Sequence, residues 1–253
     1  MLELFRFGLV CLIQSIADDF QEKQDEYFLS QIMAYNLFSF LFTRQNRIEA
    51  EHLAYLSKFN GGIMETNLKG IKVAILATDG FEQSELFEPK KALEAAGAKT
   101  HIVSLESGEI KGWDEKDWGE SIAVDITVDE ADAENYDALV LPGGVMNPDK
   151  LRMNEKAVSF VKSFFDAGKP VGAICHAPWV LIEADVLKGK TVTSWSSLKT
   201  DLENAGATWI DREVVTDNGL VTSRNPKDIP AFNAKIIEEF AEGVHRQRKA
   251  AAQ

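Results

Sequence analysis

The sequence is poor in cysteine, histidine and basic residues, and each shortage excludes a class of protein. It has two cysteines and four histidines, with no CxxC pair and no cysteine/histidine cluster at zinc-ligand spacing. We therefore expect no disulfide framework, no metal site and no cofactor, and a reducing cytoplasm as the location. With 27 basic against 40 acidic residues the net charge is −13, which argues against a nucleic-acid backbone or an anionic membrane as partner.

Long hydrophobic runs are also missing. The apolar segment 7–16 is too short to span a bilayer. It is also a poor signal peptide, because Arg6 is the single basic residue before it and the following Ala-Asp-Asp-Phe does not suit cleavage. The 253 residues suffice for one large domain, or for one domain with an appendage.

Residues 1–68 differ from the rest of the chain. They are rich in Phe, Leu, Gln and Asn, and their apolar positions recur at roughly helical spacing, which predicts an N-terminal extension with one or two amphipathic helices. Gly61-Gly62 stands just before Met64, so we hypothesise that Met64 is the native start and that the preceding segment is translated upstream sequence or dispensable. The alternative is a glycine linker after a helical appendage.

From Ile71 onward, short apolar runs alternate with helical patterns. The expected strands are 71–77, 101–105, 122–128 at an edge, 138–141, 170–174, 191–195, and a hairpin of 209–216 with 220–222; the expected helices are 84–96, 154–167, 198–205 and 229–244. Residues 107–118 are expected to form a loop. This alternation predicts an α/β domain over 69–253, with a mostly parallel sheet covered by helices on both faces.

Ligands of such sheets bind at the carboxyl ends of the strands. Three loops should therefore converge there: Asp79–Glu85, Pro142–Asp149 and Cys175–Pro178. In the last of them a strand, a cysteine and a helix with Pro178 in its first turn follow one another, the layout of a nucleophile elbow. Helix N–H groups favour a thiolate, so we expect the pKa of Cys175 to lie below its ordinary value. The alternative is a buried structural cysteine.

The groups that would assist Cys175 are less obvious. His176 is adjacent, and neighbouring side chains normally point apart, so we do not expect it to reach Cys175 within one chain; no other histidine lies in a converging loop. Of Glu82 and Glu85, one should be buried with a raised pKa and donate a hydrogen bond to the thiolate. The alternative is that both are solvated at a helix N-terminus.

Backbone N–H groups of Gly143-Gly144, together with that of His176, could stabilise an oxyanion. The alternative is an ordinary turn in which glycine supplies a positive φ, which we favour for Gly143 and leave open for Gly144.

Five stretches resemble the PfpI family of intracellular cysteine peptidases and deglycases, within the class I glutamine amidotransferase-like superfamily. They are DGFEQSELFEP (79–89), ALVLPGG (138–144), RMNEKAV (152–158), GKPVGAICHAPWVLIEADVLKGKTVTSW (168–195) and ENAGATWIDREVVTDNGLVTSRNPKD (203–228). The resemblance implies a flavodoxin-like three-layer sandwich and a nucleophilic Cys175.

The resemblance also implies roles for the surrounding residues. Glu85 would be the buried carboxyl that bonds the cysteine, with Glu82 beside it, and Gly144 with the His176 N–H would form the oxyanion hole. His176 would work with an acid from an adjacent subunit, at the position of Asp149, where the family usually has Glu. Trp195 stands where the family normally has Tyr.

The implied activity is that of a cysteine hydrolase in a homodimer or higher homo-oligomer. We favour a deglycase that repairs methylglyoxal- or glyoxal-glycated amines in stress protection, with an intracellular cysteine peptidase as the alternative. Glyoxalase activity is also credited to the family. A third interpretation is non-enzymatic: a redox sensor or chaperone-like stress protein, in which Cys175 is oxidised to a sulfinate beside Glu85.

Overall fold

A computed structural model of the chain describes residues 67–245, which belong to one compact unit, Glu65–Gln253. The proposed start at Met64 and the helices expected before it lie outside the described residues and stay predictions. Leu68, assigned to the extension, is fully buried in the domain core. None of the helices between residues 67 and 245 combines the length and apolarity needed to cross a membrane.

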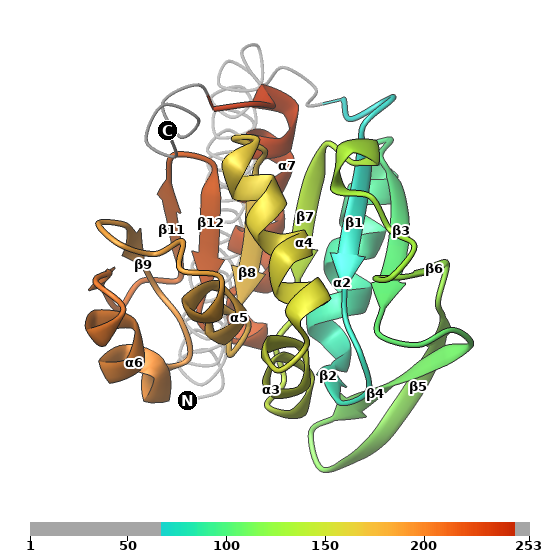
Figure 1. Cartoon of the computed structure of the whole chain (residues 1–253), viewed down its shortest axis with the longest axis horizontal. Helices are drawn as coiled ribbons and strands as arrows, with labels where there is room; N and C mark the ends of the chain where they lie inside the picture. The colour runs from blue at the N-terminus through green and yellow to red at the C-terminus, as the bar shows by residue number, and fades with distance from the viewer. Residues whose placement is uncertain (1–66, 246–253) are drawn as a thin grey trace, which may run out of the picture. The chain divides into compact units, whose positions relative to one another are not determined.

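A seven-stranded sheet forms the centre of the domain (Figure 1). Its order is β11-β12-β8-β7-β1-β3-β6, and all neighbours are parallel except β11 with β12. The strands are β1 (Lys72–Leu76), β3 (Lys99–Ser104), β6 (Ile126–Thr127), β7 (Ala138–Leu141), β8 (Val171–Ile174), β11 (Val214–Asp217) and β12 (Leu220–Ser223). The mostly parallel sheet expected from the alternating pattern is confirmed.

Helices cover both faces of this sheet. Val73 and Ile75 of β1 pack on one side with α2 (Gln83–Ala95) and α7 (Ile229–Glu242), whereas Ala74 and Leu76 pack on the other with α4 (Glu155–Asp166) and α5 (Pro178–Glu183). Successive strand residues point to opposite faces, so a strand buried on both sides must be apolar throughout. The result is the expected flavodoxin-like three-layer sandwich, with α4 in front of the sheet and α2 behind it in Figure 1.

Residues 107–118 are not a loop, contrary to expectation. They contribute β4 (Glu109–Asp114) and the start of β5 (Asp117–Ala123), an antiparallel hairpin that forms a second sheet with β2 (Phe81–Glu82). Charged residues at the tip obscured the strands, although Ile110 and Gly112 alternate as buried positions. The strand expected over 122–128 is accordingly divided between β5 and β6.

Three further segments differ in detail. The hairpin at Asp217–Leu220 is confirmed, and Asn218 and Gly219 both have the positive φ of a tight turn. However, the strands expected over 191–195 and 209–216 are shortened, because β9 (Thr191–Val192) pairs with β10 (Thr208–Trp209) in a separate sheet. Two further helices are α6 (Lys199–Asn204) and α3 (Met146–Arg152). Helix α3 begins within the segment 142–149 that was expected to be a loop.

Gly172 in β8 allows α7 to pack directly on the sheet. A Cβ atom there would lie 2.7 Å from Ile236 Cγ2 and 3.0 Å from Phe232 Cζ. We predict that Gly172→Ala lowers the free energy of unfolding by about 1–3 kcal/mol, because the buried helix must shift. Urea unfolding measures the loss, and adding Ile236→Val should recover part of it. An unchanged midpoint would show that α7 moves at no cost.

Candidate active site

Cys175 lies at the carboxyl end of β8 in a strained backbone conformation. Its φ is 64°, a left-handed value that a residue other than glycine rarely adopts. Two hydrogen bonds hold it: its N–H donates to Ser223 O (2.9 Å), and its carbonyl accepts from Trp195 N–H (3.0 Å). Strain of this kind persists only where the surroundings enforce it, and it is concentrated at functional sites.

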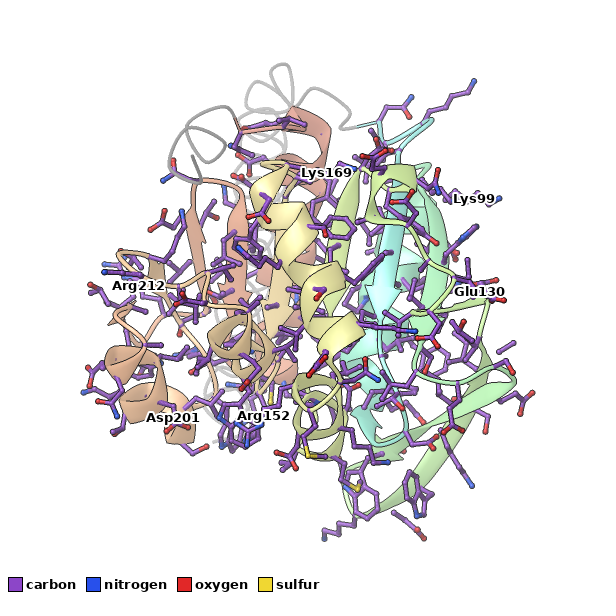
Figure 2. The ribbon with its side chains drawn as sticks, viewed as in Figure 1. Lys99, Glu130, Arg152, Lys169, Asp201 and Arg212 are labelled. Carbon is purple, nitrogen blue, oxygen red and sulfur yellow. The ribbon has the colours of Figure 1, made fainter. Side chains whose placement is uncertain are left out.

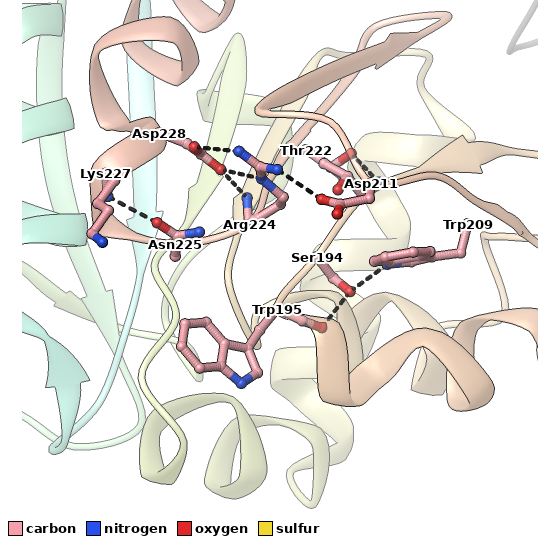
Figure 3. Close-up of polar contacts among 10 residues, drawn as sticks. Ser194, Trp195, Trp209, Asp211, Thr222, Arg224, Asn225, Lys227 and Asp228 are labelled. Carbon is pink, nitrogen blue, oxygen red and sulfur yellow. Dashed lines mark hydrogen bonds and ion pairs between the residues drawn. The ribbon is translucent and has the colours of Figure 1, made fainter.

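The chain that follows Ser223 is itself fixed by an ion-pair cluster (Figure 3). The Arg224 guanidinium donates from Nε (2.8 Å) and Nη2 (3.0 Å) to the buried Asp228 and from Nη1 (2.7 Å) to Asp211. Asp228 also accepts from the backbone N–H of Arg224. The end of β12, and with it the carbonyl that holds Cys175, is therefore immobilised. Sequence reasoning missed this cluster, because its residues have no spacing that marks them.

His176 contacts Cys175 within the same chain, which corrects the expectation that the two side chains point apart. The distance from Sγ to His176 Nδ1 is 3.2 Å. The left-handed conformation of Cys175 redirects the chain at the elbow, so the usual divergence of neighbours does not hold. The imidazole stacks on Trp195 (centroids 5.8 Å apart, planes at 25°) and also contacts Trp179.

Glu85, in the first turn of α2, is fully buried beside the cysteine. Burial raises its pKa from 4.5 to about 8, and the charge of Glu82 adds to this effect. Oε2 accepts a hydrogen bond from Gly143 N–H (2.9 Å), whereas Oε1 is buried and has no hydrogen-bond partner among the described residues. Because a buried carboxylate is poorly solvated, Glu85 is mainly protonated at neutral pH, and its carboxyl hydrogen-bonds with Cys175.

Glu82 keeps more contact with solvent. It is only half-buried, and burial raises its pKa as well, opposed by a hydrogen bond from Ser84 Oγ (3.3 Å). Of the two carboxyls, Glu85 is thus the one expected to be buried with a raised pKa.

The two glycines after β7 have different functions. Gly143 does not have a positive φ, contrary to the ordinary turn we favoured; it is needed because a Cβ atom would lie 2.5 Å from Glu85 Oε2 and 2.6 Å from Cys175 Cβ. Gly144 has φ 77°, and its N–H stabilises both the Glu85 carboxylate and the Cys175 thiolate.

The fully buried Asn147, which sequence reasoning missed, accepts a hydrogen bond from Thr78 N–H and donates one to the Pro142 carbonyl.

The thiol pKa moves opposite to the sequence-based expectation. Burial raises the pKa of Cys175, and the negative charge of Glu85 raises it further when that carboxyl is ionised, while the N–H groups of Gly144 and His176 act in the other direction. Burial also lowers the pKa of His176. The environment therefore favours a neutral thiol beside a neutral imidazole, and the imidazole lies close enough to accept the thiol proton.

Asp149 takes part in a different contact within this chain. It lies on α3 and pairs with Arg152 (Asp149 Oδ1 to Nη2, 3.0 Å), and no hydrogen bond or ion pair in the described part of the chain joins it to His176. The Arg152 guanidinium lies over the ring of Trp179 (4.9 Å), whose Nε1 donates to Asp201. Figure 2 shows Arg152 and Asp201 at the same end of the molecule.

The raised pKa of Glu85 predicts a pH-dependent stability. Between pH 4.5 and about 8 the folded protein holds a proton that the unfolded chain has lost. Stability should therefore fall as pH rises through this window, with a slope approaching about 1.4 kcal/mol per pH unit. Glu85→Gln should flatten this slope in urea unfolding, whereas Glu88→Gln, exposed on the same helix, should not. Equal slopes in all three proteins would mean that Glu85 is already ionised.

The DJ-1/PfpI family matches residues 71–239. The chain is 44% identical over 168 residues to "Deglycase PfpI" of Pyrococcus furiosus, covering 66% of this chain and 98% of that protein. It is 45% identical over 167 residues to YraA of Bacillus subtilis, whose name carries a provisional assignment as a cysteine protease (66% and 96% covered).

"General stress protein 18" of Bacillus subtilis is 44% identical over 170 residues, with 66% of this chain and 96% of that protein covered. Among solved structures, the chain is similar to Drosophila melanogaster DJ-1beta, with TM-score 0.61, 29% identity, and 72% and 95% of the two chains covered. These names point to a hydrolase-type enzyme. The family match spans most of the chain, and the relatives are covered almost completely; the chain belongs to the DJ-1/PfpI family.

Proposed function

We propose that this chain is a cysteine-dependent deglycase that repairs methylglyoxal- or glyoxal-glycated amino groups by releasing the free amine. The observation that carries the proposal is the contact of Cys175 Sγ with His176 Nδ1 at 3.2 Å, beside the buried Glu85. A nucleophile, a base and a neutral carboxyl acid thus meet in one chain. The relatives named deglycase support the choice of reaction.

The proposed reaction begins with transfer of the Cys175 proton to the neutral His176. Sγ then bonds to the carbon that carries the amine, and the nitrogen leaves as the free amine with the proton from His176. The hemithioacetal that remains rearranges through an enediol. The neutral His176 takes the proton from its first carbon and returns it to its second carbon, while the protonated Glu85 gives a proton to the oxygen on the second carbon and regains one from the hydroxyl on the first. The product is a thioester, and water hydrolyses it to the hydroxy acid and the free thiol.

Backbone donors assist where negative charge develops. The N–H groups of Gly144 and His176 both stabilise charge on Cys175, so they also lie near the place where a substrate oxyanion forms. Trp195 stacks on His176 and limits its rotation, but it lacks the hydroxyl of the family's Tyr.

Specific observations support two alternative functions, a cysteine peptidase and a redox sensor. A cysteine peptidase also cleaves a carbon–nitrogen bond, and YraA is named for that activity. However, Cys175 is only 6% exposed, which suits a two- or three-carbon adduct better than a folded polypeptide. A redox sensor would use oxidation of Cys175 beside Glu85, and a relative named as a stress protein is compatible with it.

We also propose a cytoplasmic location and a homo-oligomer. A reducing compartment keeps Cys175 as a thiol. Because His176 reaches Cys175 within one chain, no partner is needed to supply the histidine. The support for the oligomer is the family resemblance, together with Asp149, which is half exposed on α3 and accessible to a partner.

The deglycase assay separates the function classes. Purified protein should release free N-acetyl-lysine from its methylglyoxal adduct without added metal or nucleotide. Cys175→Ala should lower the rate at least about a thousandfold, because the nucleophile is lost, whereas Cys11→Ala should not. Free methylglyoxal must be monitored, because a glyoxalase mimics repair by removing the aldehyde. Casein hydrolysis alone would favour the peptidase, and peroxide oxidation of Cys175 without either activity would favour the sensor.

A mixing experiment tests the shared site. Asp149→Ala should weaken catalysis without unfolding the protein. Combining Asp149→Ala chains with Cys175→Ala chains should restore about a quarter of the active sites, since half of random dimers are mixed and each has one complete site. Arg152→Gln is the control for loss of the contact within α3. A fully active monomer in sedimentation, or no restoration on mixing, would show that the site is self-contained.

A further inference from the structure

A second cluster of chemically reactive side chains lies at the end of α7. It consists of Glu239, Glu242 and His245, whose ligand atoms all lie within 4.8 Å of one another. Glu239 and Glu242 are three residues apart and so share one face of the helix. Gly243, with φ 77°, then ends the helix and turns the chain so that His245 faces both carboxylates.

Two loops fix the position of His245. Its backbone N–H donates to Gly168 O (2.9 Å), in the loop before β8. Its ring lies against Gly219, in the turn before β12, so closely that a Cβ atom at Gly219 would be 2.9 Å from Nε2. Cys175 follows the opposite end of β8, so this cluster is separate from the active site (Figure 1).

The two innermost atoms of the cluster are buried and leave hydrogen-bonding capacity unused. Glu239 is 7% exposed, and its Oε2 lies 3.2 Å from His245 Nε2. Neither atom has a hydrogen-bond partner of acceptable geometry in residues 67–245. Burying such groups unsatisfied costs about 1–3 kcal/mol each, so a cation that takes both lone pairs would relieve a real penalty.

The separation of these atoms also fits a shared metal ligand sphere. Two ligands bound to tetrahedral zinc at about 2.0–2.1 Å lie about 3.3 Å apart, close to the observed 3.2 Å. One imidazole and two carboxylates match zinc, whereas calcium and magnesium prefer oxygen ligands alone. The alternative to a metal site is an ion pair between a protonated His245 and Glu239.

We propose that Glu239, Glu242 and His245 bind a zinc ion, with Glu242 on the solvent side and a water molecule as fourth ligand. The ion holds His245, which contacts the loops before β8 and β12, to the end of α7. Because the unfolded chain lacks this arrangement, bound zinc stabilises the folded protein. The ligands follow a Glu-x2-Glu-x2-His pattern, which is not a familiar zinc spacing and was not noticed in the sequence.

The test uses the full chain with Cys11→Ser and Cys175→Ser, so that thiols cannot bind the metal. Equilibrium dialysis against ZnCl2 should retain one zinc per chain, and zinc should raise Tm. His245→Gln and Glu239→Gln should each weaken binding at least tenfold and remove the Tm rise. Glu238→Gln makes the same charge change on the same helix, where Glu238 pairs with Lys235, and should behave as the parent does.

A spectroscopic measurement keeps the test independent of variant stability. Cobalt(II) bound in place of zinc should give the intense visible bands of a four-coordinate site in the thiol-free parent, and zinc should displace it stoichiometrically. If the parent retains no zinc, or if His245→Gln and Glu239→Gln bind it as well as the parent does, the His245–Glu239 contact is an ion pair only and the proposal is wrong.

Discussion

The candidate site depends on the left-handed backbone of Cys175. This one strained residue turns the chain from β8 toward α5 and brings His176 back to Sγ. The strain is sustained by Ser223 on one side and Trp195 on the other, and Ser223 in turn depends on the ion pair of Arg224 with the buried Asp228. A local conformation that costs on the order of 1–3 kcal/mol is thus maintained by contacts from two other segments of the chain.

The second constraint is that ionisable groups are buried with few hydrogen bonds or opposite charges to stabilise their ionised forms. Burial leaves the charged forms of Cys175, His176 and Glu85 poorly solvated. It raises the pKa of Cys175 and Glu85 and lowers the pKa of His176, so that the neutral form is favoured in each case. Charge can then move within the site by proton transfer over short distances, without a stable ion in the resting protein. This arrangement differs from a permanent imidazolium–thiolate pair.

Much of the domain followed from sequence patterns. Strands buried on both faces are continuously apolar, so β1, β7 and β8 were recognisable, as was the tight turn at Asn218-Gly219. The β4–β5 hairpin was missed because its charged tip resembles a loop, and β9 and β10 were extended too far because strand pairing, not local composition, sets their length.

The sequence by itself determined a mostly parallel sheet covered by helices on both faces and the three loops at its carboxyl edge, and the resemblance to the PfpI family pointed to Glu85 as the neighbour of Cys175. Tertiary structure alone decided which atoms meet. His176 reaches Sγ only because of one backbone dihedral, Gly143 is required only because Glu85 and Cys175 pack against it, and His245 faces Glu239 only because two loops hold it. Periodicity reports which face of an element is buried, but contacts between segments depend on dihedrals and distances that no spacing in a sequence encodes.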